Sequence, residues 1–129
     1  MTKRELKQYR SICAEIQEIH IRMKEQSAHE TVQGSDVEYP YIFHTVSVYG
    51  AIPSSETQRL LARENKLSVQ RDEIERFIDS IDDSLTRRIF EYRYMVGGRK
   101  SWVKVAALVG GGNTPDGVRM IHDRYLIKN

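Results

Sequence analysis

The chain has 129 residues, of which 40% are hydrophobic and 29% charged, and this suits one soluble domain or a small domain with an extension. No stretch reaches the roughly 18 apolar residues of a membrane span, and the charged N-terminus lacks the apolar run of a signal peptide. The lone cysteine, Cys13, excludes an internal disulfide, so we expect a protein of the reducing cytoplasm without membrane contact.

The first part of the chain predicts a long helix from residue 2 to about residue 27, with Thr2 as its cap. Its apolar stripe is broad and requires a partner helix. The stripe consists of Leu6, Tyr9, Cys13, Ile16, His20 and Met23, widened by Ile12 and Ile19. Because no further ligands lie in register, we interpret Cys13 and His20 as packing residues rather than metal ligands.

A loop is predicted over residues 28–40, where Gly34 and Pro40 oppose regular structure. Residues 41–49 are rich in β-branched and aromatic side chains and predict a short strand. A single strand needs a pairing partner, which is either residues 30–33 or a strand of a second protomer. Its tyrosines are also candidates for stacking on bases, but the stretch contains no Lys or Arg, which favours a structural role.

Ser54 and Ser55 start a second long helix, which is predicted to run to about Ile81. Its apolar stripe consists of Leu60, Leu67, Ile74 and Ile81, with Leu61, Phe77 and Ile78 beside it. We expect this helix to pair antiparallel with the first one, and a homodimer to form through the long helices. Asp82 to Ser84 end the helix and cap the next one.

Three short helices are predicted between Ser84 and Ile127, and each boundary has residues that stop or cap a helix. These residues are Gly97, Gly98, Ser101, Gly110, Gly111, Gly112, Thr114 and Pro115. Each helix has one apolar face, and we expect the three faces to form a small core around Trp102. The faces are Leu85, Ile89, Tyr92 and Val96; Trp102, Val105, Ala106 and Val109; and Val118, Ile121 and Tyr125.

The predicted fold class is therefore mostly α. Two long antiparallel helices with a short β segment between them form an oligomerisation region over residues 1–83. A three-helix domain over residues 84–129 follows, and its helix, glycine turn and helix are typical of helix-turn-helix DNA-binding proteins.

Charge is unevenly divided between these two parts. From Leu85 to Asn129 nine Lys and Arg stand against three Asp and Glu, a net charge of +6, whereas the preceding residues have eleven against fifteen, a net charge of −4. A basic module beside an acidic one indicates DNA binding at one end and protein contact at the other. No phosphate loop, dinucleotide fingerprint or paired-cysteine zinc motif occurs, so we expect neither an enzyme nor a cofactor nor a metal.

Several short motifs of the C-terminal third resemble those of phage-encoded RinA/ArpU-type transcriptional regulators, whose C-terminal module is similar to domain four of bacterial sigma factors. They are Glu91-Tyr92-Arg93-Tyr94, Gly97, Ser101-Trp102, Val105-Ala106, Gly110 to Thr114, Val118-Arg119-Met120 and Arg124-Tyr125-Leu126. Residues 34–46 resemble the middle of these proteins more loosely. The resemblance implies a sequence-specific regulator of late or packaging genes in a phage or prophage. It also implies double-stranded DNA and host RNA polymerase as partners.

The resemblance also implies that a recognition helix over about residues 114–127 enters the major groove. The base-facing candidates are Asp116, Arg119, Met120 and Asp123. Arg119 leads them, because a guanidinium group can read guanine with two hydrogen bonds. The phosphate candidates are Arg99, Lys100, Lys104, Thr114 and Arg124, and a solvated surface charge is the alternative for each basic residue.

Two features depart from the family's pattern and keep other functions open. Val103, Ala107 and Leu108 stand where polar residues are usual and predict an apolar docking patch. Asp116 and Asp123 bring negative charge near the groove, which suggests cytosine readout or modest affinity. The alternatives to a dimeric regulator are a small terminase subunit, which would form a ring, and an interaction protein that does not bind DNA.

Overall fold

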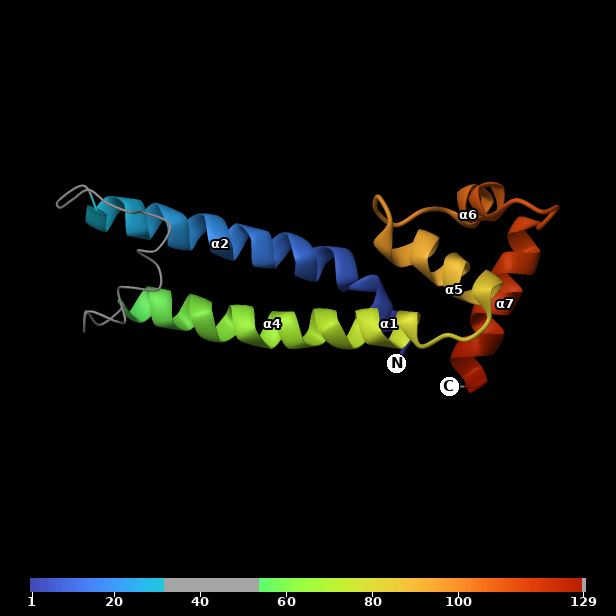
Figure 1. The fold of residues 1–129 in the computed structure, drawn as a ribbon, viewed down its shortest axis with the longest axis horizontal. Helices are drawn as coiled ribbons and strands as arrows, with labels where there is room; N and C mark the ends of the chain where they lie inside the picture. Colours follow the sequence, from blue (N-terminus) through green and yellow to red (C-terminus); the bar gives the residue numbers. More distant parts are fainter. Residues whose placement is uncertain (32–53, 129) are drawn as a thin grey trace. The chain divides into compact units, whose positions relative to one another are not determined.

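The computed structural model describes residues 1–31 and 54–128, and these residues are mostly helical, as predicted (Figure 1). The helices are α1 (Lys3–Lys7), α2 (Tyr9–Thr31), α4 (Ser55–Asp79), α5 (Ser84–Phe90), the π-helical turn η2 (Glu91–Met95), α6 (Trp102–Val109) and α7 (Pro115–Lys128). The strand predicted over residues 41–49 lies outside the described residues, which contain no strand. Within those residues, no helix has both the length and the apolar character needed to cross a membrane.

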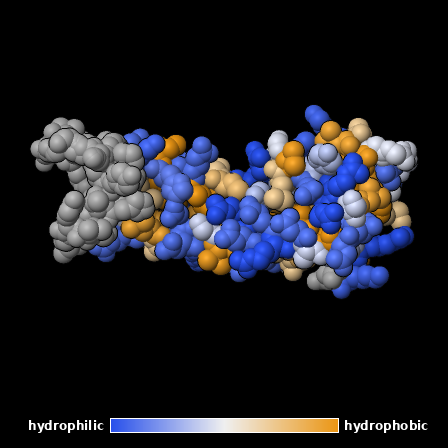
Figure 2. All heavy atoms as spheres, in the orientation of Figure 1, coloured by the Kyte–Doolittle hydropathy of each residue, from blue (hydrophilic) through white to orange (hydrophobic). Residues whose placement is uncertain are grey.

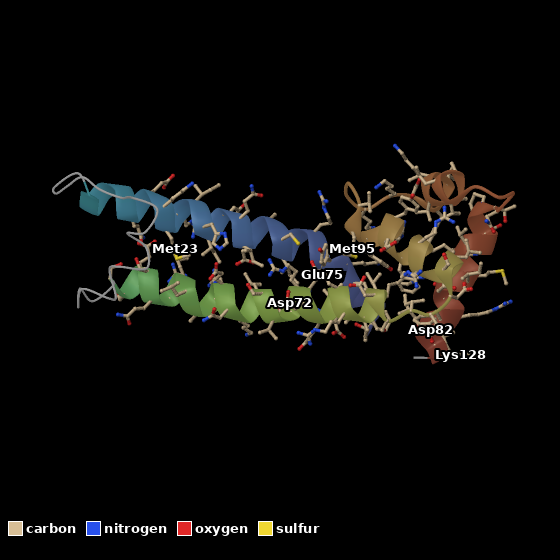
Figure 3. All side chains as sticks on the ribbon, in the orientation of Figure 1. Met23, Asp72, Glu75, Asp82, Met95 and Lys128 are labelled. Atoms are coloured by element: carbon tan, nitrogen blue, oxygen red, sulfur yellow. The ribbon has the colours of Figure 1, made fainter. Side chains whose placement is uncertain are left out.

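The chain divides into two compact units, which we call the core unit (Met1–Cys13 and Gln70–Asn129) and the hairpin unit (Ala14–Val69). These units group the residues differently from the predicted division after residue 83. The first residues of the chain belong to the core unit. The Tyr9 hydroxyl donates a hydrogen bond of 2.7 Å to Glu75 of α4, and Lys3 Nζ lies 3.5 Å from Asp123 Oδ1 of α7. Figure 3 shows Glu75 on the last turns of α4.

In the hairpin unit α2 and α4 run antiparallel, since Gln26 contacts Thr57 while His20 contacts Glu64 further along both helices. A small apolar cluster joins the two helices, and Figure 3 shows Met23 between them. The cluster consists of Ile19, Met23 and Leu60, with Leu67 packed against it. Residues 28–31 belong to α2, so the loop prediction is wrong there and so is the helix end at residue 27.

The first predicted helix is interrupted at Gln8, so α1 and α2 replace it. Thr2 caps α1 as predicted, and Glu5 completes a capping box with it. A new stripe begins with α2, and its buried side chains are Tyr9, Ile12, Ile16, Ile19 and Met23. The prediction that His20 packs in the core is therefore wrong: Ile19 takes the buried position, and the exposed His20 pairs with Glu64.

The helices that follow begin close to their predicted caps. Ser54 accepts the Thr57 amide at 3.1 Å at the start of α4, and Asp83 accepts the Thr86 amide at 3.0 Å at the start of α5. Hydrogen bonds from the Thr86 hydroxyl and amide lower the pKa of Asp83. Helix α4 ends at Asp79.

The predicted core of α5, α6 and α7 is confirmed for most residues. Ile89, Val105, Ala106, Val109 and Val118 form a buried cluster. Leu85, Tyr92, Trp102 and Ile121 pack against it. Val96 was placed wrongly, since it is 49% exposed while Tyr94 is buried. The wider turn η2, with its Val96 amide bonded to the Glu91 carbonyl at 2.9 Å, breaks the 3.6-residue period on which that prediction rested.

Candidate nucleic-acid interface

Helix α6, a turn of three glycines and α7 follow one another in the core unit. Ser101 accepts the Lys104 amide at 3.3 Å and caps α6. Gly110 to Gly112 all have φ near +70°, a conformation that other residues rarely adopt, so the turn depends on glycine. Thr114 accepts the Gly117 amide at 3.0 Å, and Pro115 is the first residue of α7, as predicted.

Gly117 has a local explanation that the sequence did not reveal. A Cβ atom at this position would lie 3.0 Å from Thr114 Oγ1, the oxygen that caps the helix. Glycine therefore leaves space for the cap.

The four predicted base-facing residues lie on one side of α7, and three of them are exposed. The Asp116 side chain is 86% exposed and the Arg119 side chain 50%, and the two form an ion pair of 3.7 Å. Met120 is 47% exposed. The fourth residue, Asp123, is held by neighbours: its Oδ1 accepts a hydrogen bond of 2.9 Å from His122 Nδ1 and lies 3.5 Å from Lys3 Nζ.

The exposed side of α7 carries its cations at the edges rather than along the middle. With 3.6 residues per turn, Asp116, Met120, Asp123 and Ile127 share one line along the helix, opposite the buried Val118 and His122. Arg119 and Arg124 flank that line on its two sides. The middle of the candidate interface is thus acidic and apolar, and its positive charge lies to either side.

The predicted phosphate contacts fall into two groups. Arg99, Lys104 and Arg124 are exposed, and in the part of the chain that the structure describes no hydrogen bond or ion pair engages their side chains. Lys100 instead donates to the carbonyls of Val96 and Gly98 and so closes the glycine loop before α6. Thr114 is engaged as the cap of α7.

Three further arginines counted in the basic half bind main-chain oxygens. Arg87 donates to the carbonyl of Ile81 at 2.7 Å, and Arg88 to that of Val109 at 3.3 Å. Arg93 donates to the carbonyl of Lys100, and its guanidinium carbon lies 4.1 Å from the centre of the Trp102 ring. These guanidinium groups keep their positive charge, but part of their hydrogen-bonding capacity is used within the protein rather than for an external partner.

His122 of α7 is fully buried, although it was not among the residues predicted to pack in the core. Its ring stacks on Phe90 at 4.7 Å and meets Trp102 edge-on at 4.9 Å. Burial lowers the pKa of His122 despite the hydrogen bond to Asp123, which raises it. His122 lies four residues after Val118 and three before Tyr125, a spacing that places all three on one face of a helix. This spacing could have predicted the burial of His122.

No group of three His, Cys, Asp or Glu side chains suited to a metal ion occurs within residues 1–31 and 54–128. No protein-family model, curated protein or solved structure matches the chain.

Proposed function

We propose that the chain is a sequence-specific DNA-binding transcriptional regulator of a phage or prophage, similar to the RinA/ArpU-type proteins. In this proposal α6, the glycine turn and α7 are a helix-turn-helix, and α7 enters the major groove. The observation that carries it is the exposed side of α7, where Arg119 and Met120 face outward beside a glycine turn and a cap that fix the helix.

In the proposed complex, Arg119 reads a guanine and Arg99, Lys104 and Arg124 contact phosphates on either side. The ion pair between Arg119 and Asp116 does not oppose this role, because an exposed pair contributes only about 0–1 kcal/mol and is readily exchanged for a guanine. The acidic middle of the exposed side favours modest affinity, with Asp116 as an acceptor for a cytosine amino group.

Titration of labelled duplex DNA at two salt concentrations tests the proposal. We expect binding that weakens steeply as salt rises, because bound lysines and arginines release counterions from the phosphates. Absence of binding at low salt would reject both the regulator and a small terminase subunit. A mass measurement in solution separates these two, since a dimer supports the regulator and a ring of many subunits supports the terminase.

A further inference from the structure

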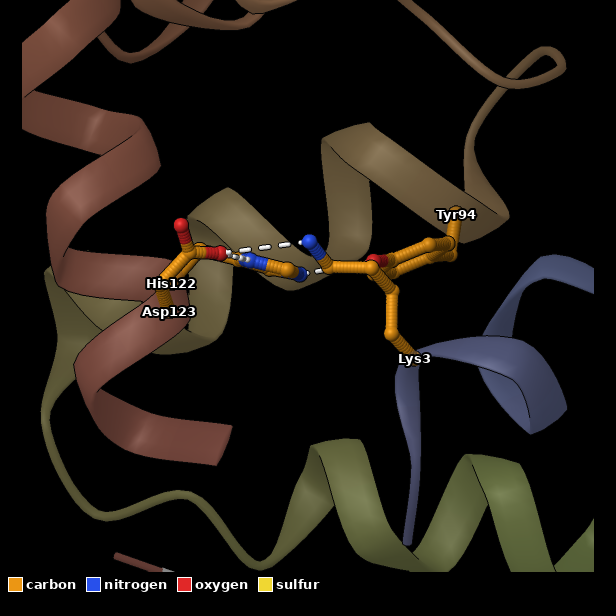
Figure 4. Close-up of polar contacts among 4 residues, drawn as sticks. All are labelled: Lys3, Tyr94, His122 and Asp123. Atoms are coloured by element: carbon orange, nitrogen blue, oxygen red, sulfur yellow. Dashed lines mark hydrogen bonds and ion pairs between the residues drawn. The ribbon is translucent and has the colours of Figure 1, made fainter. Parts of the chain in front are cut away.

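A chain of polar contacts crosses the core unit from η2 through α7 to α1 (Figure 4). The Tyr94 hydroxyl lies 2.6 Å from His122 Nε2, and His122 Nδ1 lies 2.9 Å from Asp123 Oδ1. Lys3 Nζ lies 3.5 Å from the same carboxylate oxygen. Residues from both ends of the chain therefore meet at one carboxylate of the proposed recognition helix.

The protons in this network have one consistent arrangement. Burial keeps the pKa of His122 low and raises the pKa of Tyr94 to about 12, so both groups are neutral at neutral pH. Tyr94 then donates to Nε2, and the Nδ1–H of His122 donates to Asp123. Burial alone would raise the pKa of Asp123, but the hydrogen bond from His122 and the charge of Lys3 outweigh it and lower that pKa. Asp123 is therefore an anion, and Lys3 is the cation that faces it.

This arrangement matters for the charge of α7. Its two carboxylates are each paired, Asp116 with Arg119 of the same helix and Asp123 with Lys3 of α1. Asp123 lies on the exposed line of α7 with 36% of its side chain exposed, so an unpaired charge there would repel DNA phosphates. We propose that Lys3 is a positioning residue for DNA binding, which holds Asp123 against His122 and cancels its negative charge.

The position of Lys3 is fixed by its surroundings rather than by the ion pair alone. Thr2 and Glu5 form the capping box that starts α1, and Leu6 is fully buried. After α1, the Arg10 guanidinium lies near the turn at Gly98, where a Cβ atom would be 3.8 Å from its Nη2. The start of the chain is thus packed within the core unit on both sides of Lys3.

This inference rests on the proposed DNA binding, and its test is a double-mutant cycle with Lys3→Met and Asp123→Asn. Duplex affinity is measured for the wild type, both single variants and the double variant. We expect Lys3→Met to weaken binding by up to about fivefold, as for the loss of one exposed ion pair, and to have no such effect in the Asp123→Asn background. Lys7→Met is the matched control, because Lys7 lies on the same helix and makes no ion pair within the described residues.

Each outcome of the cycle has a distinct meaning. An equal loss from Lys3→Met in both backgrounds would mean that Lys3 meets DNA directly or that its loss only disturbs folding, and no loss in either background would also overturn the inference. If the wild type itself fails to bind duplex DNA, the proposed function fails first. The His122 ring then gives a second readout by NMR: we expect its pKa to rise in Lys3→Met, and an unchanged pKa overturns the contact itself.

Discussion

The core unit and the hairpin unit differ in what fills their interiors. Phe90, Tyr94 and His122 are packed ring against ring in the core unit, and Phe90 also meets Phe77 and Tyr125 edge-on. The described cluster of the hairpin unit contains isoleucine, leucine and methionine only. Aromatic rings bury more area and prefer defined geometries, whereas methionine adapts to irregular gaps. We expect the core unit to be the more rigid part of the molecule.

The two units also differ in what they leave exposed. In the hairpin unit Ile21, Leu61 and Val69 lie exposed on α2 and α4. Figure 2 shows hydrophobic side chains among the hydrophilic ones on the surface. The homodimer that the sequence predicts through the long helices stays a prediction. In the core unit the exposed Val103 and Leu108 lie on α6, where the sequence predicted an apolar patch.

The largest expected effect compares the two interiors directly. We expect Phe90→Ala to lower the free energy of unfolding by about 3–5 kcal/mol, because Phe90 is fully buried and contacts several rings. Met23→Ala should cost less, near the lower end of the range of about 2–5 kcal/mol for such changes, because its cluster is small. Urea unfolding followed by circular dichroism measures both, with the exposed Val103→Ala as the control. An equal loss for Phe90 and Met23 would remove the distinction between the units.

The next effect concerns DNA rather than stability. We expect Arg119→Ala to weaken binding to the preferred duplex by about 1–3 kcal/mol and to relax the base preference at one position. The control is Arg59→Ala, which removes an exposed arginine from α4 of the hairpin unit. Selection of preferred sequences from random duplexes, followed by titration, measures the change. A similar loss from Arg59→Ala would place DNA on the hairpin unit instead.

The buried histidine makes the core unit sensitive to acid. Because the pKa of His122 is lower when folded, the unfolded chain binds the proton first, and stability falls as pH drops below about 6.5. The slope is at most about 1.4 kcal/mol per pH unit and ends below the folded pKa. Lys3, Arg93 and Asp123 are the charged groups around the ring, and the lowered pKa of Asp123 acts only at more acidic pH.

Urea unfolding near pH 7 and near pH 5.5 measures this dependence, and His122→Gln is the variant for comparison. The variant should be less stable throughout and should lose much of the slope between the two pH values. An unchanged slope would show that another group takes up the proton.

The smallest effect tests the helix caps of the two units. Ser101→Ala and Ser54→Ala each remove a hydroxyl that accepts a backbone amide, so each should cost about 1 kcal/mol in thermal unfolding. Replacement by aspartate should retain most of the cap. Similar costs for the two serines would show that packing, and not capping, distinguishes the units. A much larger cost at one serine would contradict that interpretation.

Features that depend on local chemistry were predictable from the sequence. The caps at Thr2, Ser101 and Thr114 are confirmed. Each cap is a hydrogen bond from a backbone amide to a side chain three residues earlier, so it depends only on residues that are close in the sequence. The apolar period likewise identified most of the core around Val105 and Val118.

Features that depend on distant parts of the chain were not predictable. The π-helical turn η2 moves Tyr94 inward and Val96 outward, and no local residue pattern signals it. Lys3 and Asp123 meet from opposite ends of the chain, so their pairing required the folded structure. The same holds for Arg87 and Arg88, which the sequence shows only as part of the basic half and whose guanidinium groups donate to main-chain carbonyls.

The most direct test of α7 as the DNA-reading helix is an NMR titration of isotope-labelled protein with a selected duplex. We expect the largest amide shifts along α7, at Asp116, Arg119 and Met120, with smaller shifts at the start of α6 near Lys104. Shifts confined to the hairpin unit, or none at low salt, would contradict the proposal.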